Sequence, residues 1–492
     1  MGSLPCPHFV IFPFMSQGHT IPLLHLSRLI RRRSAAVTII TTAGNAPPIR
    51  ASLKDTDVSI LELPFPQNIK NIPPGVENTH QLPSMSCFLD FAKSTKLMQK
   101  NFEHALENLN PPVSAIISDG FLGWTLQSAQ KISVPRFVFF GMGNFSCTMY
   151  QILGRENPHV DTVSLDDPFF IAPGFFPELK LTRNDFEPPF NEIGPSGPFV
   201  DFMAEQIISM AMSDGMIVNS FYELEKCYVD YWNDKIGPKA FCVGPLCLAA
   251  KISPSETLEK LNYINFLDEK LENQEPVLYV AFGTQAEVSS EQIREIAMGL
   301  EKSEVSFLWA LKPNGPGCID FFQEFEERVK NRGIVVREWV DQVKILRHGG
   351  VKGFLSHCGW NSVMESISAG VPILAVPFMA EQHLNARFLA EEVGVGLRVM
   401  PNGGSVRGFV AAEEVERMVR ELMGGEKGAE VRRKVAEYGG AACESMKDGG
   451  SSMRTLDLLI DQLGGNKTLS FSRGESVPSC QQGQDLGFVH VK

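Results

Sequence analysis

Residues 339–382 read WVDQVKILRHGGVKGFLSHCGWNSVMESISAGVPILAVPFMAEQ, and their pattern predicts one strand–helix–strand unit. The apolar run KGFLS (352–356) predicts a buried strand, and HCGW (357–360) predicts a tight turn. A helix is predicted over NSVMESISAG (361–370), and a second strand over PILAVP (372–377). Strand, glycine turn, helix and strand in that order are the repeating unit of a parallel sheet whose faces are covered by helices.

The start of this helix offers groups that suit a nucleotide diphosphate. Asn361 and Ser362 occupy its first turn, where free backbone N–H groups and the helix dipole favour an anion. His357 precedes the turn and can donate to the same anion, and Gly359 permits the sharp backbone turn. Glu365 lies on the helix face of Asn361 and Ser362, where a carboxylate can accept two ribose hydroxyls. Each residue alone suits an ordinary structural role, but their combination favours a nucleotide site.

Apolar runs alternate with helical patterns along the whole chain. These runs are continuous, which indicates a parallel sheet with helices on both faces. The predicted strands of the first half are 8–14, 37–42, 58–64, 113–118, 134–140, 216–221 and 240–244. Those of the second half are 277–283, 306–311, 333–338, 352–356 and 372–377. The main predicted helices are 20–33, 85–108, 122–132, 290–302, 361–369, 381–393, 411–422 and 427–463.

Two similar halves joined by a weakly patterned segment predict an α/β fold of two doubly wound domains that face each other across a cleft. We expect a first domain at 1–245, a linker at 246–258 and a second domain at 259–464, whose last helix can pack back on the first domain. Residues 465–492 are polar and unpatterned, which predicts a disordered tail. In such sheets ligands bind beyond the carboxyl ends of the strands.

Composition excludes several classes of partner. The 492 residues carry a net charge of −12, which disfavours nucleic acid and anionic membrane surfaces. The ten cysteines are scattered without CxxC or zinc-like spacing, which indicates reduced thiols. The first fifteen residues lack the basic region of a signal peptide, and no apolar run is long enough to span a bilayer. We expect a cytoplasmic monomer.

A second candidate site lies near the N-terminus. His19 falls in the turn after the first strand, within FPFMSQGHTIPLL (12–24), and Asp119 directly follows the strand 113–118. Both therefore lie at the carboxyl ends of strands, at the same edge of the sheet. A histidine can remove a proton from a hydroxyl near neutral pH, and a carboxylate can orient it. From the residues alone, a helix cap at His19 and a turn residue at Asp119 fit equally well.

Residues 339–382 closely resemble the signature box of the plant secondary-product glycosyltransferases, the family 1 UDP-sugar-dependent enzymes. The resemblance rests on HCGWNS, ES, AGVP and the terminal EQ. FGTQAE (282–287) and SDGFLGW (118–124) also look like family segments, and the resemblance covers the chain to about residue 464. It implies the GT-B fold of two facing Rossmann-like domains and a transfer from a UDP-sugar, which we expect to invert the anomeric carbon.

The resemblance implies roles for individual residues. His19 would be the catalytic base and Asp119 its partner. Trp339 would stack on uracil and Val340 would read its edge, while Gln342 and Glu365 would bind the ribose. The residues that would contact the diphosphate, around the turn at Gly359, are Gly283, Thr284, His357, Asn361 and Ser362. Those that would contact the sugar are Trp360, Glu381 and Gln382.

This chain departs mildly from the family pattern. Val340 and Asp341 replace the usual Ala or Ser followed by Pro, and Glu381 replaces the commoner Asp, which could alter donor choice. Gln382 goes with glucose in the family, and Trp360 argues against glucuronate, so UDP-glucose is the expected donor. We expect no cofactor and no metal. The acidic triplet 55–57 lies in a polar stretch and is interpreted as a solvated loop.

The acceptor is open. Met85, Phe88 and Phe91 recur at three-residue spacing, and FFIAPGFFPELKL (169–181) is rich in Phe, but both patterns favour core packing over a pocket. A flavonoid or another phenol is our hypothesis. The alternatives are another UDP-sugar, the extension of an existing glycoside, and a non-catalytic binding protein. An oxidoreductase is disfavoured because the first turn lacks GxGxxG.

Overall fold

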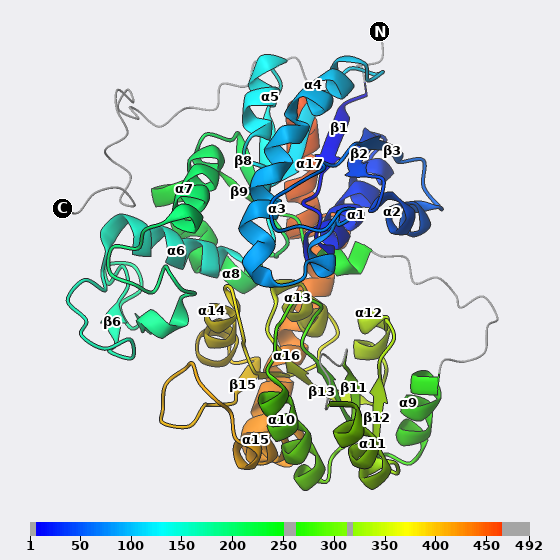
Figure 1. Ribbon diagram of the computed structural model, residues 1–492, viewed down its shortest axis with the longest axis vertical. Helices are drawn as coiled ribbons and strands as arrows, with labels where there is room; N and C mark the ends of the chain where they lie inside the picture. Colours follow the sequence, from blue (N-terminus) through cyan, green and yellow to red (C-terminus); the bar gives the residue numbers. More distant parts are fainter. Residues whose placement is uncertain (1–5, 250–261, 312–317, 465–492) are drawn as a thin grey trace. The chain divides into compact units, whose positions relative to one another are not determined.

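Each half of the chain builds its own parallel sheet. The computed structural model describes residues 6–249, 262–311 and 318–464, which form two α/β units (Figure 1). Of these residues, unit 1 holds 6–158, 192–249 and 445–464. Unit 2 holds 159–191, 262–311 and 318–444. In the described parts of the chain, no helix is long and apolar enough to cross a membrane.

The sheet of unit 1 has seven strands in the order β3-β2-β1-β4-β5-β8-β9, all parallel. They are β1 (His8–Phe12), β2 (Ala36–Thr42), β3 (Ser59–Leu63), β4 (Ala115–Asp119), β5 (Arg136–Phe140), β8 (Gly215–Val218) and β9 (Ala240–Cys242). The strand order reverses between β1 and β4, and such a switch point is where doubly wound sheets bind ligands.

The sheet of unit 2 repeats this plan with six parallel strands in the order β12-β11-β10-β13-β14-β15. They are β10 (Val277–Ala281), β11 (Ser306–Ala310), β12 (Gly333–Val336), β13 (Val351–Ser356), β14 (Ile373–Ala375) and β15 (Gly396–Arg398). Its switch point lies between β10 and β13. The two sheets confirm the prediction of two doubly wound domains, and β15 is a strand that the prediction missed.

Helices cover both sheets. In unit 1 they are α1 (Gln17–Arg32), α2 (Ala46–Leu53), α3 (Phe88–Ser94), α4 (Gln99–Glu107), α5 (Thr125–Lys131), α6 (Asn144–Glu156), α7 (Pro198–Ala211), α8 (Tyr222–Tyr231) and α17 (Ser451–Gly464). In unit 2 they are α9 (Asn262–Glu272), α10 (Ser290–Ser303), α11 (Cys318–Val329), α12 (Gln342–Leu346), α13 (Trp360–Ser368), α14 (Gln382–Arg387), α15 (Ala412–Gly424) and α16 (Glu426–Ser445). A two-stranded antiparallel pair, β6 (Phe169–Phe170) and β7 (Lys180–Leu181), completes unit 2.

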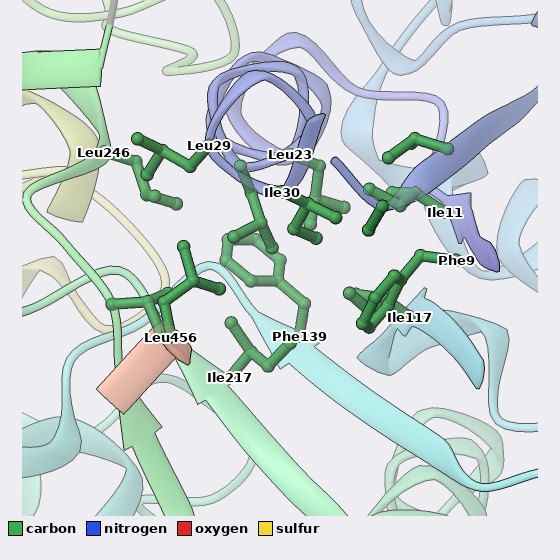
Figure 2. Packing of buried hydrophobic residues seen from close by; sticks show 14 of the residues in the cluster. Phe9, Ile11, Leu23, Leu29, Ile30, Ile117, Phe139, Ile217, Leu246 and Leu456 are labelled. Carbon is green, nitrogen blue, oxygen red and sulfur yellow. The ribbon is translucent and has the colours of Figure 1, made fainter. Parts of the chain in front are cut away.

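The core of unit 1 shows why α17 belongs there. Leu23, Leu29 and Ile30 of α1 lie on the sheet residues Phe139 and Ile217, among other buried apolar side chains (Figure 2). Leu456 of α17 lies in the same cluster and is fully buried. An ion pair between Arg33 and Asp457 also joins the end of α1 to α17. The last helix therefore completes the first core, although it comes from the end of the described chain.

The division of the chain differs from the predicted bounds in one segment. Residues 159–191 lie in unit 2, whereas the prediction placed all of 1–245 in the first domain. Arg407 of unit 2 holds this segment, because its guanidinium forms a 2.9 Å ion pair with Glu187 and donates to the Asn184 carbonyl at 2.8 Å. Such long-range polar contacts leave no periodic signal in the sequence.

Several predicted elements are broken where the backbone turns. The helix predicted over 427–463 is two helices, α16 and α17, separated at Gly449, whose φ is +76°. The helix predicted over 85–108 is α3 and α4 with short 3₁₀ turns before and between them. Of the predicted linker 246–258, residues 246–249 form a 3₁₀ turn, and the rest lies outside the described residues, as does the predicted tail 465–492.

Candidate active site

The switch point of unit 1 brings together His19 and Asp119. His19 lies in the first turn of α1 and Asp119 ends β4, the strand that pairs with β1. The Nδ1 atom of His19 is 2.7 Å from Oδ2 of Asp119. The Asp119 side chain is 1% exposed, whereas that of His19 is 23% exposed. A buried carboxylate therefore orients an imidazole that remains open to solvent, which is the arrangement expected of a general base.

Aromatic rings surround this histidine. The ring centroids of Phe14 and Phe121 lie 5.8 Å and 5.5 Å from that of His19. Phe88 is half-buried and packs on both, at 5.8 Å and 5.3 Å. Gly141, just beyond β5, closes another side, because a Cβ there would lie 3.6 Å from the His19 ring. Sequence reasoning missed Phe14, Phe121 and Gly141, although all three adjoin the ends of predicted strands.

The switch point of unit 2 holds His357 between two glycines. The positive φ of the turn from β13 into α13 falls at Cys358, at +64°, and not at Gly359, whose φ is −59°. The prediction that Gly359 permits the sharp turn is therefore wrong, because its backbone conformation suits other residues too. A Cβ on Gly283 would lie 2.8 Å from the His357 Nε2 atom, and one on Gly359 would lie 2.5 Å from it. Burial lowers the pKa of His357 to about 4, so this imidazole is neutral at pH 7 and can donate one N–H.

A hydrogen-bond network fixes Glu365 on the same helix. Gln342 Nε2 donates to Glu365 Oε2 at 2.6 Å and to Ser362 Oγ at 2.9 Å. The hydroxyl of buried Tyr279 donates to Gln342 Oε1 at 3.1 Å, which sets the orientation of the amide. Burial raises the pKa of Glu365 to about 7, against the opposing hydrogen bond from Gln342. Tyr279 was not predicted, since it lies in a buried strand.

The residues expected around a sugar lie at the starts of α13 and α14. Gln382 Oε1 accepts the backbone N–H groups of Phe378 and Met379 at 3.0 Å and 3.1 Å. Asn385 Nδ2 donates to the Cys358 carbonyl at 2.9 Å and lies 3.4 Å from Glu381 Oε1. Asn385 was also missed, and it ties the sugar-side carboxylate to the turn at Cys358.

The remaining predicted residues differ in exposure. Trp339 is 65% exposed and Thr284 is exposed, so both can meet a ligand, and Val340 is half-buried. Trp360 is only 2% exposed and packs near Phe388, with ring centroids 6.3 Å apart. Asn361 and Ser362 occupy the first turn of α13 as predicted.

Comparisons with known proteins agree with this arrangement. The family model described as UDP-glucoronosyl and UDP-glucosyl transferase matches residues 222–419. The chain is 47% identical to UDP-glycosyltransferase 90A1 of Arabidopsis thaliana over 466 residues, covering 93% of this chain and 96% of that protein. It is 44% identical to UDP-glycosyltransferase 90A2 of the same plant, covering 94% and 99%. The chain belongs to the plant family 1 UDP-glycosyltransferases.

Solved UDP-glycosyltransferases share the fold. The crystal structure of UGT73P12 from Glycyrrhiza uralensis, complexed with glycyrrhetinic acid 3-O-monoglucuronide, matches with a TM-score of 0.82 at 28% identity, covering 93% of this chain and 96% of that one. That of UGT2 from Phytolacca americana, complexed with UDP-2fluoro-glucose and pterostilbene, matches with a TM-score of 0.77 at 28% identity, covering 94% and 100%. These matches confirm the predicted GT-B class and the predicted transferase activity.

The two carboxylates of the acidic triplet 55–57 in this UDP-glycosyltransferase form ion pairs with arginines. Arg28 pairs with Asp55 at 2.7 Å, and Arg31 pairs with Asp57. The Arg31 guanidinium lowers the pKa of Asp57. Two carboxylates that each neutralise an arginine are poor ligands for a divalent cation, in keeping with the interpretation of the triplet as a loop.

Proposed function

We propose that this UDP-glycosyltransferase is an inverting O-glucosyltransferase that uses UDP-glucose and a small aromatic acceptor, a flavonoid or another phenol. The observation that carries the proposal is the 2.7 Å contact between His19 Nδ1 and Asp119 Oδ2, with the imidazole half-buried and the carboxylate fully buried. A base of this kind is needed because an acceptor hydroxyl must lose its proton as it attacks the sugar.

In the proposed step, His19 Nδ1–H donates to Asp119, so Nε2 is the nitrogen that takes the acceptor proton. The acceptor oxygen then forms a bond to C1 of the sugar while the bond from C1 to the β-phosphate oxygen breaks. The electron pair of that bond leaves with UDP, and attack from the opposite side inverts C1. Asp119 stabilises the imidazolium that results.

The charge that develops on UDP is met by the start of α13. The first-turn N–H groups at Asn361 and Ser362 and the helix dipole favour a diphosphate. Neutral His357 adds a donor without adding a charge. We therefore propose that these groups replace a metal in this reaction.

Donor choice is proposed from the start of α14. The carbonyl oxygen of Gln382 is taken by two backbone N–H groups, so its amide nitrogen is the end that a sugar hydroxyl can meet. Glu381, held near Asn385, can accept from a second hydroxyl. Trp360 is so deeply buried that we assign its contact to the backbone N–H rather than to the ring.

The aromatic rings around His19 support a flat phenolic acceptor. Solved relatives include the Phytolacca americana enzyme with pterostilbene and UGT89C1 of Arabidopsis thaliana with quercetin, which are both aromatic phenols. A second candidate function is the extension of an existing glycoside. It is favoured by the Glycyrrhiza uralensis relative, whose bound molecule already carries a glucuronyl group.

We also propose that the enzyme works in a reducing compartment, the cytosol, and as a monomer. Eight cysteines of the described residues are free thiols, including the buried Cys147, Cys242 and Cys358. Thiols in this number without a disulfide are typical of reducing surroundings.

The proposal is tested by UDP release with a mixture of phenols and with UDP-glucose, UDP-galactose and UDP-glucuronate in turn. Wild type and His19→Ala are compared, and products are identified by mass and by the anomeric configuration in NMR spectra. Acceptor-dependent release with UDP-glucose, a β-linked product and loss of release in the variant support the proposal. A preference for another donor would contradict the assignment of UDP-glucose, and a product formed only when phenolic glycosides replace the free phenols would support the second candidate instead.

A further inference from the structure

Arg136 is a fully buried arginine inside the sheet of unit 1. It begins β5, and its side chain runs along the sheet toward the end of β4. Nε donates to Ser118 Oγ at 2.8 Å, and Nη2 donates to the backbone carbonyl of Asp119 at 3.2 Å. Nη1 donates to Ser213 Oγ at 2.8 Å and to Ser209 Oγ at 3.2 Å. All three nitrogens are therefore satisfied, and the residue they reach at the sheet edge is the partner of His19.

The acceptors of this guanidinium are neutral. Among the described residues, no carboxylate forms an ion pair with it, and its four acceptors are hydroxyls and one carbonyl. Burial lowers the pKa of Arg136 to about 9, and the negative charge of Asp119 acts in the opposite direction. Arg136 is thus still a cation at pH 7. A buried cation is costly, so its charge at this position must be compensated by nearby groups.

The charged groups around Arg136 are few. Asp119 lies at the end of β4, with His19 beyond it, and Asp214 accepts the Arg136 backbone N–H at 2.9 Å. The helix that packs on it, α7, contributes a hydroxyl at Ser209 and an amide at Gln206, not a charge. Asp119 is therefore the carboxylate toward which the buried positive charge of Arg136 is directed.

The same cluster holds the turn that carries the Asp119 carboxylate. Asp119 Oδ1 accepts the Phe121 N–H at 3.0 Å, which caps the short turn after β4. Behind that turn, Gly123 donates to Gln206 Oε1 at 2.9 Å and accepts from Ser209 Oγ at 2.8 Å. Because Ser209 is also an acceptor of Arg136, the guanidinium joins the end of β4, the turn and α7 into one unit.

We propose that Arg136 is a positioning residue for the His19–Asp119 pair: it fixes the end of β4 from inside the sheet and balances the negative charge of Asp119. A nearby positive charge disfavours the charged form of an imidazole, so the guanidinium would oppose the effect of the Asp119 carboxylate on His19. The inference rests on the roles proposed for His19 and Asp119.

The test uses the full-length protein with Arg136→Met, which removes the charge, and Arg136→Lys, which keeps it. Arg28→Met is the matched control, since Arg28 is a second buried arginine of unit 1 that pairs with Asp55, not with Asp119. The measurements are kcat and KM for UDP-glucose between pH 5 and 9, and the titration of His19 by NMR in the unliganded protein.

We expect Arg136→Met to lower kcat by about 10- to 100-fold, as losses of supporting residues do elsewhere, with KM for UDP-glucose changed less than about twofold. The acidic limb of the pH profile and the His19 titration midpoint should both rise, by about 0.5 to 1 pH unit, because the opposing cation is gone. Arg136→Lys should lower kcat but leave both midpoints near those of wild type. Arg28→Met should change neither the acidic limb of the pH profile nor the His19 titration midpoint.

The outcomes distinguish a failure of the proposed function from a failure of the inference about Arg136. If His19→Ala keeps wild-type activity, the proposed function fails, whatever Arg136 does. If His19→Ala is inactive and Arg136→Met lowers kcat without moving either midpoint, Arg136 is structural and the inference is wrong. If Arg136→Met does not fold, two other variants are measured: Arg136→Lys, and the double variant Ser209→Ala with Ser213→Ala. An unchanged kcat in both variants would overturn the inference. A lowered kcat at unchanged KM would support it.

Discussion

Two sheets with the same strand order end in sites of opposite character. At the switch point of unit 1, the turn after β1 presents His19 with a buried carboxylate at 2.7 Å and phenylalanine rings around it. At the switch point of unit 2, the turns after β10 and β13 present His357 between two glycines, with a helix start beside it. The architecture places a histidine at each edge, and the neighbours of that histidine decide its chemistry.

The charge and the close packing of these neighbours determine the chemistry of each histidine. A carboxylate beside the half-buried His19 imidazole can stabilise the imidazolium that proton removal leaves, as a base requires. Close packing without a carboxylate keeps His357 neutral, with a pKa of about 4, so it can donate to phosphate but cannot act as a base near pH 7. In the proposed function, one fold thus separates proton removal from anion binding by changing a few turn residues. Four changes test this separation, and the largest effect is expected at the base.

His19→Ala should reduce kcat/KM by about 10²- to 10⁴-fold, because the acceptor proton loses its base. Binding of UDP should be unchanged, since the nucleotide residues lie in unit 2. Acceptor-dependent UDP release and calorimetry with UDP measure the two effects. The matched control is His25→Ala, six residues further along α1, which should keep near wild-type turnover. Equal losses in both variants would show that α1, rather than the base, had been damaged.

Gly359→Ala should raise KM for UDP-glucose by about 10- to 100-fold, because the new methyl would lie 2.5 Å from His357 Nε2 and must displace the ring. The backbone itself tolerates alanine, since the φ of Gly359 is −59°. Gly424→Ala is the control, because a Cβ there would meet no atom within 4 Å. A wild-type KM in Gly359→Ala would contradict a donor role for His357.

Affinity for UDP-glucose should increase as the pH rises through about 7, where Glu365 ionises. Below that pH the carboxyl group carries a proton and accepts ribose hydroxyls poorly; above it, the carboxylate accepts both. The gain between pH 6 and 8 should reach at most about tenfold, following the ionised fraction. UDP-glucose is the suitable ligand because its diphosphate does not titrate in this range. Glu365→Gln should bind weakly and without this pH dependence.

Tyr279→Phe should weaken UDP-glucose binding by about fivefold, since one buried hydrogen bond to Gln342 is lost. The ring stacking with Phe354, at 4.9 Å, is kept, so folding should be little affected. Isothermal titration calorimetry compares the binding of UDP-glucose with that of its 2′-deoxy analogue. The effect of Tyr279→Phe should shrink there, because the contact that we propose between Glu365 and the missing hydroxyl is already absent; an equal effect on both ligands would contradict that contact.

Much of the fold and of the candidate site could be predicted, because the sequence patterns that indicate them are local. Continuous apolar runs predicted all seven strands of the unit 1 sheet to within a few residues, and VTIITT at 37–42 matches β2 almost completely. The order strand, turn, helix around Gly359 placed Asn361 and Ser362 at the start of α13. The turn after β1 likewise placed His19 at the sheet edge, where Asp119 meets it.

The rest depends on contacts that local patterns do not encode. Asn385 and Tyr279 act through single hydrogen bonds to residues 27 and 63 positions away, at the Cys358 carbonyl and at Gln342. Arg136 lies in a strand that reads as apolar, and its polar partners come from two distant segments, 118–119 and 209–214. Short β15 (Gly396–Arg398) has too few residues for a periodic signal.

The path of the chain between the two units limits how such enzymes can be recombined. It passes from one unit to the other after residue 158, after residue 191, between 249 and 262, and after residue 444. A chimera of two relatives joined within 246–258 would therefore pair the Glu187 of one parent with the Arg407 of the other. It would also pair the Asp457 of one parent with the Arg33 of the other. Crossovers that carry residues 159–191 with the second half, and α17 with the first, would keep each set of partners together and give hybrids that fold.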